Sequence, residues 1–314
     1  MKFSIIIPLY NKESTVRRAL YSALDQHNVD QNEIEILVVN DGSTDASVAQ
    51  VMKIACEQSH RHITLVNQVN AGVSAARNAG AARANGEILC FLDADDTYKP
   101  NFLSELKKLI TQFPQSSLFA TAYHFINTAK GSKTKAKLRN IGSATEPHIL
   151  SNFFLSASNG DLPFCASSFG ITKQAFEELG GFPESENMGE DQDLYARAAL
   201  HKKIAYSPTA CANYFEDVQN SLMNTPQVLE EMPYSKRLQQ HLDLNEVPPE
   251  LVHSVKRYIS GHIIDLVRRN LQNGCNSEAR NLLTDKRSKI KTLRWCYWYV
   301  QCRYSRHLGF LKRS

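Results

Sequence analysis

The 314-residue sequence has no apolar run long enough to cross a bilayer and no cysteine pair with metal-binding or redox spacing. A membrane-spanning helix needs about 20 consecutive apolar residues. The seven cysteines are widely scattered, which argues against a disulfide framework and favours a reducing compartment. The opening stretch KFSIIIPLYN has the pattern of a strand and lacks the features of a signal peptide. We therefore expect a cytoplasmic protein, soluble or peripheral on the cytoplasmic face of a membrane.

The net positive charge of the chain comes from one segment. The net charge is +4, yet residues 286–314 hold nine Lys and Arg and no Asp or Glu, which leaves −5 for the rest. This distribution excludes a basic groove along the whole fold, so we expect no nucleic-acid partner. The segment also contains LRWCYWYV. It predicts either a C-terminal helix packed on the protein with its charges in water, or an interfacial helix that places Trp295, Trp298 and neighbouring tyrosines among anionic lipid headgroups.

Short apolar runs alternate with helical periodicity through the first 125 residues. Strands are expected over residues 3–7, where Pro8 ends the run, and over 34–39, 63–66, 88–92 and 118–123. Helices are expected over 16–24, from the turn at 40–43 to about residue 58, and over 72–85 and 100–112. Buried strands joined by helices predict an α/β fold with a mostly parallel, Rossmann-like central sheet flanked by helices.

The second half of the chain has a different pattern. Residues 130–146 are polar and predict a loop or hairpin, followed by a strand near 165–171 and a helix from 173. Beyond about residue 220 the pattern is that of amphipathic helices, with candidates at 250–272 and 286–304. We therefore expect a domain over 1–220 and a helical C-terminal region over 221–314.

Polar clusters follow the predicted strands at residues 8–13, 40–45, 67–70 and 93–96. In open parallel sheets, ligands bind beyond the carboxyl ends of the strands. Asp93 and Asp95, in FLDADDTYKP, are two apart and share one face of an extended chain. They could hold Mg²⁺ or Mn²⁺, which prefer oxygen ligands, or they could belong to a solvated turn.

Three further positions each allow two interpretations. Asp41 either belongs to a turn that caps the next helix or accepts hydrogen bonds from a base or ribose. Gly72 and Arg77, at the start of a helix, are either surface residues or part of an anion site. Glu190 and Asp191, with Asp193, either place favourable charge at a helix start or supply a general base.

Taken in order, four stretches resemble the family 2 glycosyltransferases, which have the GT-A fold. They are SIIIPLYNKE, EILVVNDGSTDAS, NAGVSAARNAGAARANGEILCFLDADD and GGFPESENMGEDQDLYAR. The resemblance covers about the first 220 residues. It implies a nucleotide-sugar-binding half over 1–125, an acceptor-side half over 126–220, and a C-terminal region that associates with membrane or acceptor.

The resemblance also assigns roles to single residues. It implies that the nucleotide is held by Pro8, Tyr10, Glu13, Asp41, Asn70, Gly72 and Arg77, with Asp41 reading the base, usually uracil. Asp93 is implied to bind the ribose or sugar and Asp95 the metal. Glu190 is implied to contact substrate and Asp191 to act as the catalytic base. Asp96 is left as a cap of the turn before Thr97.

The implied activity is an inverting transfer of a hexosyl or N-acetylhexosaminyl group from a UDP-sugar to a hydroxyl of a glycan or lipid-linked acceptor. It would use Mn²⁺ or Mg²⁺ and serve polysaccharide or lipopolysaccharide biosynthesis. A sugar-1-phosphate nucleotidyltransferase is the first alternative, disfavoured because the first strand leads into Pro-Leu-Tyr-Asn and not into a Gly-rich, Arg-containing loop. A non-catalytic module that binds a sugar nucleotide or a partner enzyme is the second, and the intact acidic positions argue against it.

Overall fold

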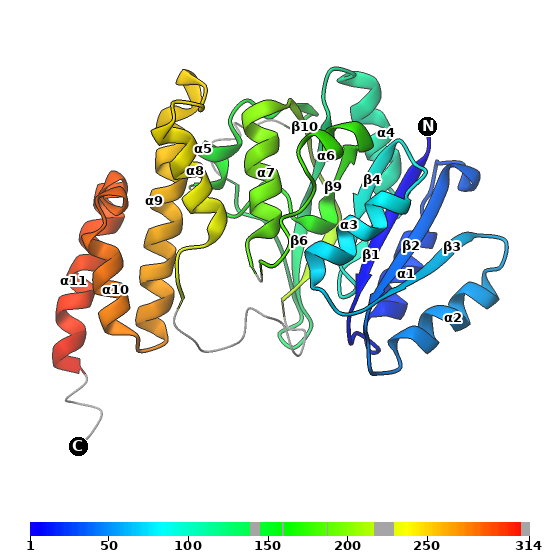
Figure 1. Cartoon of the computed structure of the whole chain (residues 1–314), viewed down its shortest axis with the longest axis horizontal. Helices are drawn as coiled ribbons and strands as arrows, with labels where there is room; N and C mark the ends of the chain where they lie inside the picture. Colours follow the sequence, from blue (N-terminus) through cyan, green and yellow to red (C-terminus); the bar gives the residue numbers. More distant parts are fainter. Residues whose placement is uncertain (139–144, 159, 187, 217–228, 309–314) are drawn as a thin grey trace. The chain divides into compact units, whose positions relative to one another are not determined.

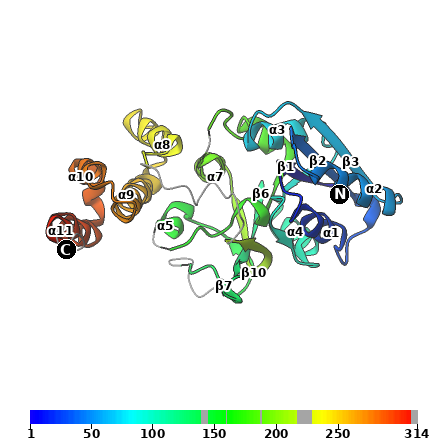
Figure 2. The same ribbon diagram turned by 90° about the horizontal axis from the view of Figure 1, so that it is seen from below.

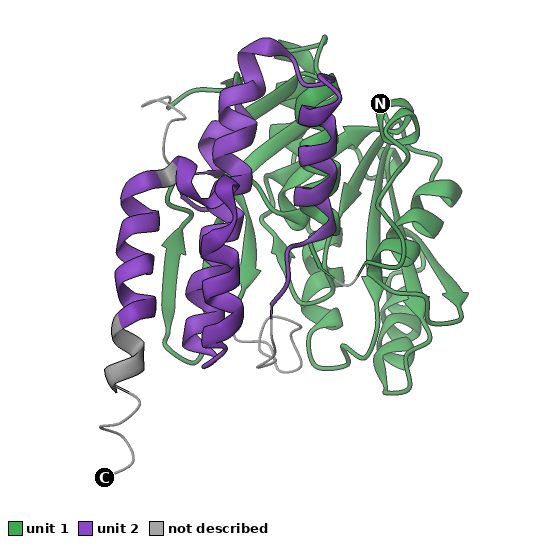
Figure 3. Cartoon of the chain, turned by 60° about the vertical axis from the view of Figure 1, so that its left-hand side comes forward, with its two compact units in different colours: residues 1–151, 162–219 green, residues 152–161, 220–314 purple. Residues whose placement is uncertain are grey.

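The computed structural model describes residues 1–138, 145–158, 160–186, 188–216 and 229–308. The chain forms two compact units, drawn in Figure 3: residues 1–151 with 162–219, and residues 152–161 with 220–314. Residues 152–161, expected in the first domain, belong to the second unit. The reason is aromatic packing, since Phe153 and Phe154 of α5 (Phe153–Ala157) contact the ring of Tyr258.

The first unit contains the predicted alternation of strands and helices (Figure 1). Its elements are β1 (Phe3–Leu9), α1 (Val16–Leu24), η1 (Gln31–Glu33), β2 (Ile34–Asp41), α2 (Ser47–Glu57), β3 (His62–Gln68), α3 (Val73–Arg83), β4 (Ile88–Phe91), β5 (Thr97–Tyr98), α4 (Phe102–Gln112), β6 (Leu118–Asn127), β7 (Ser132–Lys135), β8 (His148–Ile149), η2 (Ala166–Ser168), β9 (Phe169–Thr172), α6 (Lys173–Glu178), α7 (Glu190–His201) and β10 (Ile204–Phe215).

These strands form one sheet in the order β3-β2-β1-β4-β9-β6-β10-β5, with β7 on β6 and β8 on β10. Strands β1 to β4 are mutually parallel, β6 and β10 are parallel to each other, and β9 runs antiparallel between β4 and β6. The mostly parallel sheet is therefore confirmed. Pro8 does not end β1, contrary to the prediction. It pairs with Val39 of β2, while β4 pairs only with residues 3–6, so a missing N–H on that side leaves no partner unsatisfied.

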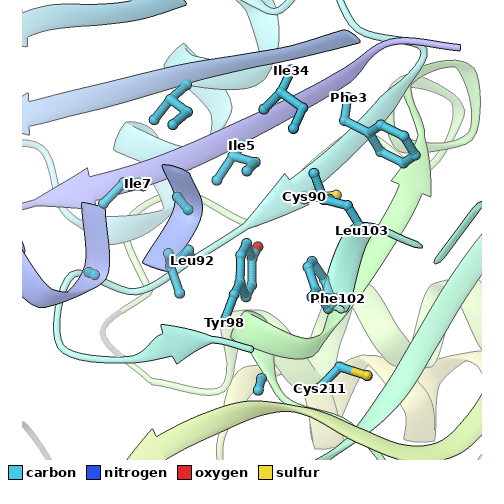
Figure 4. Packing of buried hydrophobic residues seen from close by; sticks show 14 of the residues in the cluster. Phe3, Ile5, Ile7, Ile34, Cys90, Leu92, Tyr98, Phe102, Leu103 and Cys211 are labelled. Atoms are coloured by element: carbon cyan, nitrogen blue, oxygen red, sulfur yellow. The ribbon is translucent and has the colours of Figure 1, made fainter. Parts of the chain in front are cut away.

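Helices cover both faces of the sheet. Figure 2 shows α1 and α4 on one side of β1 and α3 on the other. On the α1 and α4 side, Ile5, Ile7 and Leu103 belong to one buried cluster, and Tyr98 stacks on Phe102 at a centroid distance of 4.0 Å (Figure 4). On the α3 side, a Cβ at Gly80 would lie 2.5 Å from Ile6 Cγ2. Glycine therefore allows α3 to approach the sheet closely, and Gly80→Ala would cost about 1–3 kcal/mol through overpacking.

The second unit is helical. It comprises α5, α8 (Pro233–Asp243), α9 (Pro249–Gln272), α10 (Asn276–Thr284), η4 (Lys286–Lys291) and α11 (Thr292–Leu308). The predicted helix over 286–304 is thus a 3-10 segment followed by an α-helix, and residues 309–314 of the basic segment lie outside the described part. Among the described residues, none of the helices has the length and apolar content that a bilayer crossing requires.

Candidate active site

The carboxyl ends of β1, β2, β3 and β4 share one edge of the sheet because these strands run parallel. Leu9 lies opposite Asn40, and Asn40 lies opposite Asn67, so the loops that follow these strands begin side by side. The polar clusters predicted from the sequence therefore meet at this edge. Together with the first turn of α7, they form the candidate active site.

The loop after β1 is tied to the loop between β2 and α2. Glu13 Oε2 accepts from the Ala46 N–H at 2.8 Å, and the Glu13 N–H donates to Asp45 Oδ2 at 3.0 Å. Tyr10, next to buried Leu9, is 49% exposed. The carboxylate of Glu13 therefore organises the loop, while the ring of Tyr10 is open to a ligand.

Asp41, at the end of β2, is buried and organises the start of α3. Its carboxylate accepts from the Ala71 N–H at 2.8 Å, from the Gly72 N–H at 2.9 Å and from Gln68 Nε2 at 2.8 Å. Asn70 Nδ2 donates to the Asp41 carbonyl at 2.9 Å. Gly72 has a φ of +92°, a conformation that glycine adopts without strain. Asp41, Asn70 and Gly72 are therefore brought together, with most of the Asp41 hydrogen-bonding capacity used inside the protein.

Arg77 links two parts of the chain that are 97 positions apart in sequence. Its Nη2 lies 2.6 Å from Asp93 Oδ1 and its Nη1 lies 2.9 Å from Glu190 Oε1, and its guanidinium carbon is 5.0 Å from the centre of the Phe182 ring. The arginine side chain is only 3% exposed. Burial disfavours its charge, but the carboxylates of Asp93 and Glu190 more than offset this cost, so the pKa of Arg77 is raised.

Asp95 follows Asp93 by two residues and has different partners. Its Oδ2 lies 2.6 Å from Lys12 Nζ, and the two side chains are 21% and 22% exposed. Arg18 Nη2 donates to the Asp95 carbonyl at 2.5 Å, and the Arg18 guanidinium carbon lies 3.5 Å from the Phe215 ring centre. Two cations from the first loop and α1 therefore hold Asp95 in place.

Asp96 is not a cap of the turn before Thr97, contrary to the prediction. It is buried, and its carboxyl group accepts from Ser167 Oγ at 2.6 Å and from the Phe215 N–H at 3.0 Å. Burial, with added repulsion from Asp93 and Asp95, raises the pKa of Asp96 well above its usual value. Asp96 therefore anchors the end of β4 to η2 and β10.

Glu190 and Asp191 are the first two residues of α7. Asp191 Oδ1 accepts the Gln192 N–H at 2.6 Å. Burial, followed by repulsion from Glu190, raises the pKa of Asp191 to about 7, although Arg77 opposes the shift. The neighbouring Asp193 pairs with Arg197 at 2.6 Å. Asp193 is therefore occupied within its own helix, while Asp191 has the proton affinity that suits a general base near neutral pH.

The sequence analysis missed three residues of this edge. Lys12 and Arg18 were overlooked, although both lie within or just after the SIIIPLYNKE stretch. Ser167 had no sequence signal. It contacts residues on either side of Asp95, because its Oγ donates to Asp96 and accepts from the Asp93 N–H at 3.1 Å. These contacts join residues at least 71 positions apart, which spacing alone does not predict.

Residues 4–180, more than half of the chain, match the family described as Glycosyl transferase family 2. The chain belongs to this family. It is 38% identical over 130 residues to glycosyltransferase GlyA of Streptococcus pneumoniae, a match that covers 41% of this chain and 18% of GlyA. It is 31% identical over 211 residues to the minor teichoic acid biosynthesis protein GgaB of Bacillus subtilis, with 64% and 21% covered. The matches thus span about a fifth of the length of these two relatives.

Among solved structures, the chain is similar to S. aureus TarS 1–349 in complex with UDP-GlcNAc. The TM-score is 0.62 at 18% identity, over 98% of this chain and 92% of that one. It is also similar to the mannosyltransferase PcManGT from Pyrobaculum calidifontis in complex with GDP-Man and Mn²⁺. Here the TM-score is 0.56 at 17% identity, over 96% and 86%. At these identities the likeness concerns the fold, and it confirms the GT-A type.

Proposed function

We propose that the protein is an inverting glycosyltransferase that moves a sugar from a nucleoside-diphosphate donor, most simply a UDP-sugar, to a hydroxyl of a glycan or glycolipid. The observation that carries this proposal is the Arg77 bridge, which ties Asp93 on the strand edge to Glu190 beside Asp191. It brings donor-side carboxylates and a candidate base with a pKa of about 7 into one site.

The proposed reaction is a single displacement. The acceptor oxygen bonds to the anomeric carbon as the bond from that carbon to the diphosphate oxygen breaks, and Asp191 accepts the hydroxyl proton. A base with a pKa near the working pH combines a useful ionised fraction with sufficient proton affinity. Tyr10, Asp41, Asn70, Gly72 and the first-loop residues are proposed to hold the nucleotide.

The residues fit a divalent cation, Mn²⁺ or Mg²⁺, held through Asp95. Within the described residues there is no group of three or more His, Cys, Asp or Glu placed to hold a metal ion. Ions of this kind are commonly held by one or two carboxylates together with substrate phosphates, which fits the partly exposed carboxylate of Asp95. When bound, the ion supplies charge neutralisation at the leaving diphosphate. The Mn²⁺ in the PcManGT complex supports this assignment.

The comparisons suggest the biological setting. The relatives named for minor teichoic acid biosynthesis and the UDP-GlcNAc in the TarS complex support a role in cell-surface polysaccharide synthesis, with a hexosyl or N-acetylhexosaminyl donor. We propose a cytoplasmic location, in which sugar nucleotides and a lipid-linked acceptor could both reach the enzyme.

We further propose that α11 contacts anionic lipid through the predicted tyrosines and two aliphatic residues, and not through the two predicted tryptophans. Trp295 and Trp298 are partly buried on a cluster with Leu283 of α10, and Trp295 Nε1 donates to the Leu283 carbonyl at 3.0 Å. Among the described side chains of α11, the large apolar ones that are exposed are Leu293, at 88%, with Tyr297, Tyr299 and Val300. Leu293, Tyr297 and Val300 have i, i+4, i+7 spacing and lie on one helix face, within a segment that carries only positive charge.

The purified protein should be incubated with a panel of nucleotide sugars and Mn²⁺, with and without candidate acceptors. Release of nucleoside diphosphate that depends on Asp191 supports transfer. Pyrophosphate exchange would indicate a nucleotidyltransferase, and binding without turnover would indicate a non-catalytic module. Asp191→Asn tests the base, and Glu177→Gln, an exposed site on α6, is the matched control.

A further inference from the structure

The three carboxylates after β4 have three different kinds of partner. Asp93 faces the buried guanidinium of Arg77, and Asp96 is buried against a hydroxyl and a backbone N–H. Asp95 instead faces Lys12 Nζ at 2.6 Å, with both side chains about one-fifth exposed. Of these three partners, the lysine is the one that can leave most easily, because an ammonium on a four-carbon stem is flexible and this one is accessible to water.

The backbone that carries Lys12 is fixed on both sides. Asn11 adopts a left-handed φ of +49°, and its Oδ1 accepts the Thr44 N–H at 2.8 Å. The Lys12 N–H donates to Ser47 Oγ at 2.7 Å, and the Glu13 N–H donates to an Asp carboxylate in the same neighbouring loop. The ammonium can therefore move by side-chain rotation alone, while its attachment point stays beside Asp95.

We propose that Lys12 is the counter-ion that Asp95 exchanges for the divalent cation, and that the released ammonium then binds the diphosphate of the donor. This inference rests on the proposed function. A divalent ion and an ammonium on one carboxylate repel each other, so ion binding at Asp95 weakens its pair with Lys12. Without a nucleotide, ion binding leaves Lys12 without a partner. With a diphosphate present, both cations are neutralised, so ion and nucleotide bind cooperatively and each strengthens the other by the same factor.

The test measures Mn²⁺ binding by electron paramagnetic resonance, first with Mn²⁺ alone and then with saturating UDP or GDP. Lys12→Met removes the charge and keeps much of the length of the side chain. We expect it to bind Mn²⁺ alone about fivefold more tightly than the wild type, the upper range for a partly exposed ion pair. The gain in Mn²⁺ affinity caused by nucleotide should shrink by a similar factor. Lys12→Arg keeps the charge and should behave as the wild type.

Lys53→Met makes the same substitution at an exposed site on α2 and should change neither measurement. Circular dichroism and thermal unfolding verify that each variant is folded. If nucleotide strengthens Mn²⁺ binding equally in the wild type and Lys12→Met, the exchange is refuted while the proposed function stands. If neither nucleotide binds or alters Mn²⁺ affinity in the wild type, the donor and metal assignments fail, and the exchange fails with them.

Discussion

The pH dependence of turnover gives a test in which two substitutions should act in opposite directions. Glu190 raises the pKa of Asp191 and Arg77 lowers it, so the two neighbours work against each other. If Asp191 is the base, kcat/KM should rise with pH through about 7 as its carboxyl group ionises. Glu190→Gln should move this acid limb to lower pH, and Arg77→Met should move it to higher pH.

The size of each shift follows from the charges that are removed. Glu190→Gln deletes the adjacent like charge and also leaves Arg77, 2.9 Å from Glu190 in the wild type, to interact with the other carboxylates. Both changes favour ionised Asp191, so we expect a downward shift of about one pKa unit, equivalent to about 1.4 kcal/mol. Arg77→Met removes the opposing positive charge and should produce an upward shift of similar size.

The assay is release of nucleoside diphosphate from the preferred donor and acceptor at subsaturating substrate, from pH 5 to pH 9. Constant ionic strength is needed because surface charges are screened by salt. Glu177→Gln controls for the loss of one exposed negative charge and should leave the acid limb in place. Shifts of both site variants in the same direction, or an acid limb that persists in Asp191→Asn, would show that another group titrates.

Three further outcomes follow from the structure. Burial raises the pKa of Asp191 to about 7 in the folded state, so the ionised carboxylate destabilises the folded protein. This destabilisation grows as the pH rises above about 4, the usual pKa of an aspartate. Asp191→Asn should therefore raise the free energy of unfolding by about 1–2 kcal/mol at pH 8 and little at pH 4, measured by denaturant titration. Asp95→Ala should reduce turnover by about 100-fold or more without changing the circular dichroism spectrum, and near-normal turnover would remove its metal role. Leu293→Glu should reduce flotation with anionic vesicles, whereas Leu244→Glu, at an exposed leucine after α8, should not; no binding by the wild type would refute the lipid contact.

The first four strands and the helices between them could be predicted because their signals are local. Continuous apolar runs and helical spacing occur within single elements, and the parallel arrangement then follows from the connections. β10 was missed because Pro208 interrupts its sequence. The structure accommodates this proline where the pairing with β6 shifts register, between Ser207 and Ala210. Such a shift depends on the partner strand and has no signature in the strand's own sequence.

The sequence predicts which residues belong to the candidate site, but not which of them pair with each other. Asp93, Asp95, Arg77 and Asp191 follow from recognisable stretches, and the structure places them around one sheet edge, while their roles stay predictions. Their pairings could not be derived from spacing. Nothing in three neighbouring aspartates indicates that Asp96 is the buried one, because that is decided by remote groups on η2 and β10.

The Arg77 bridge has a consequence for how the two halves of the site act together. The guanidinium uses one nitrogen for Asp93 and another for Glu190, a geometry that its planar fork allows and a lysine ammonium could not reproduce. The charge that pairs with Asp93 is therefore the same charge that lowers the proton affinity of Asp191. A ligand that neutralises or displaces Asp93 changes the field at the base without touching it. If Asp93 contacts the donor and Asp191 is the base, donor binding and base ionisation are linked through Arg77, and the acid limb of the free enzyme and that of the donor complex should differ.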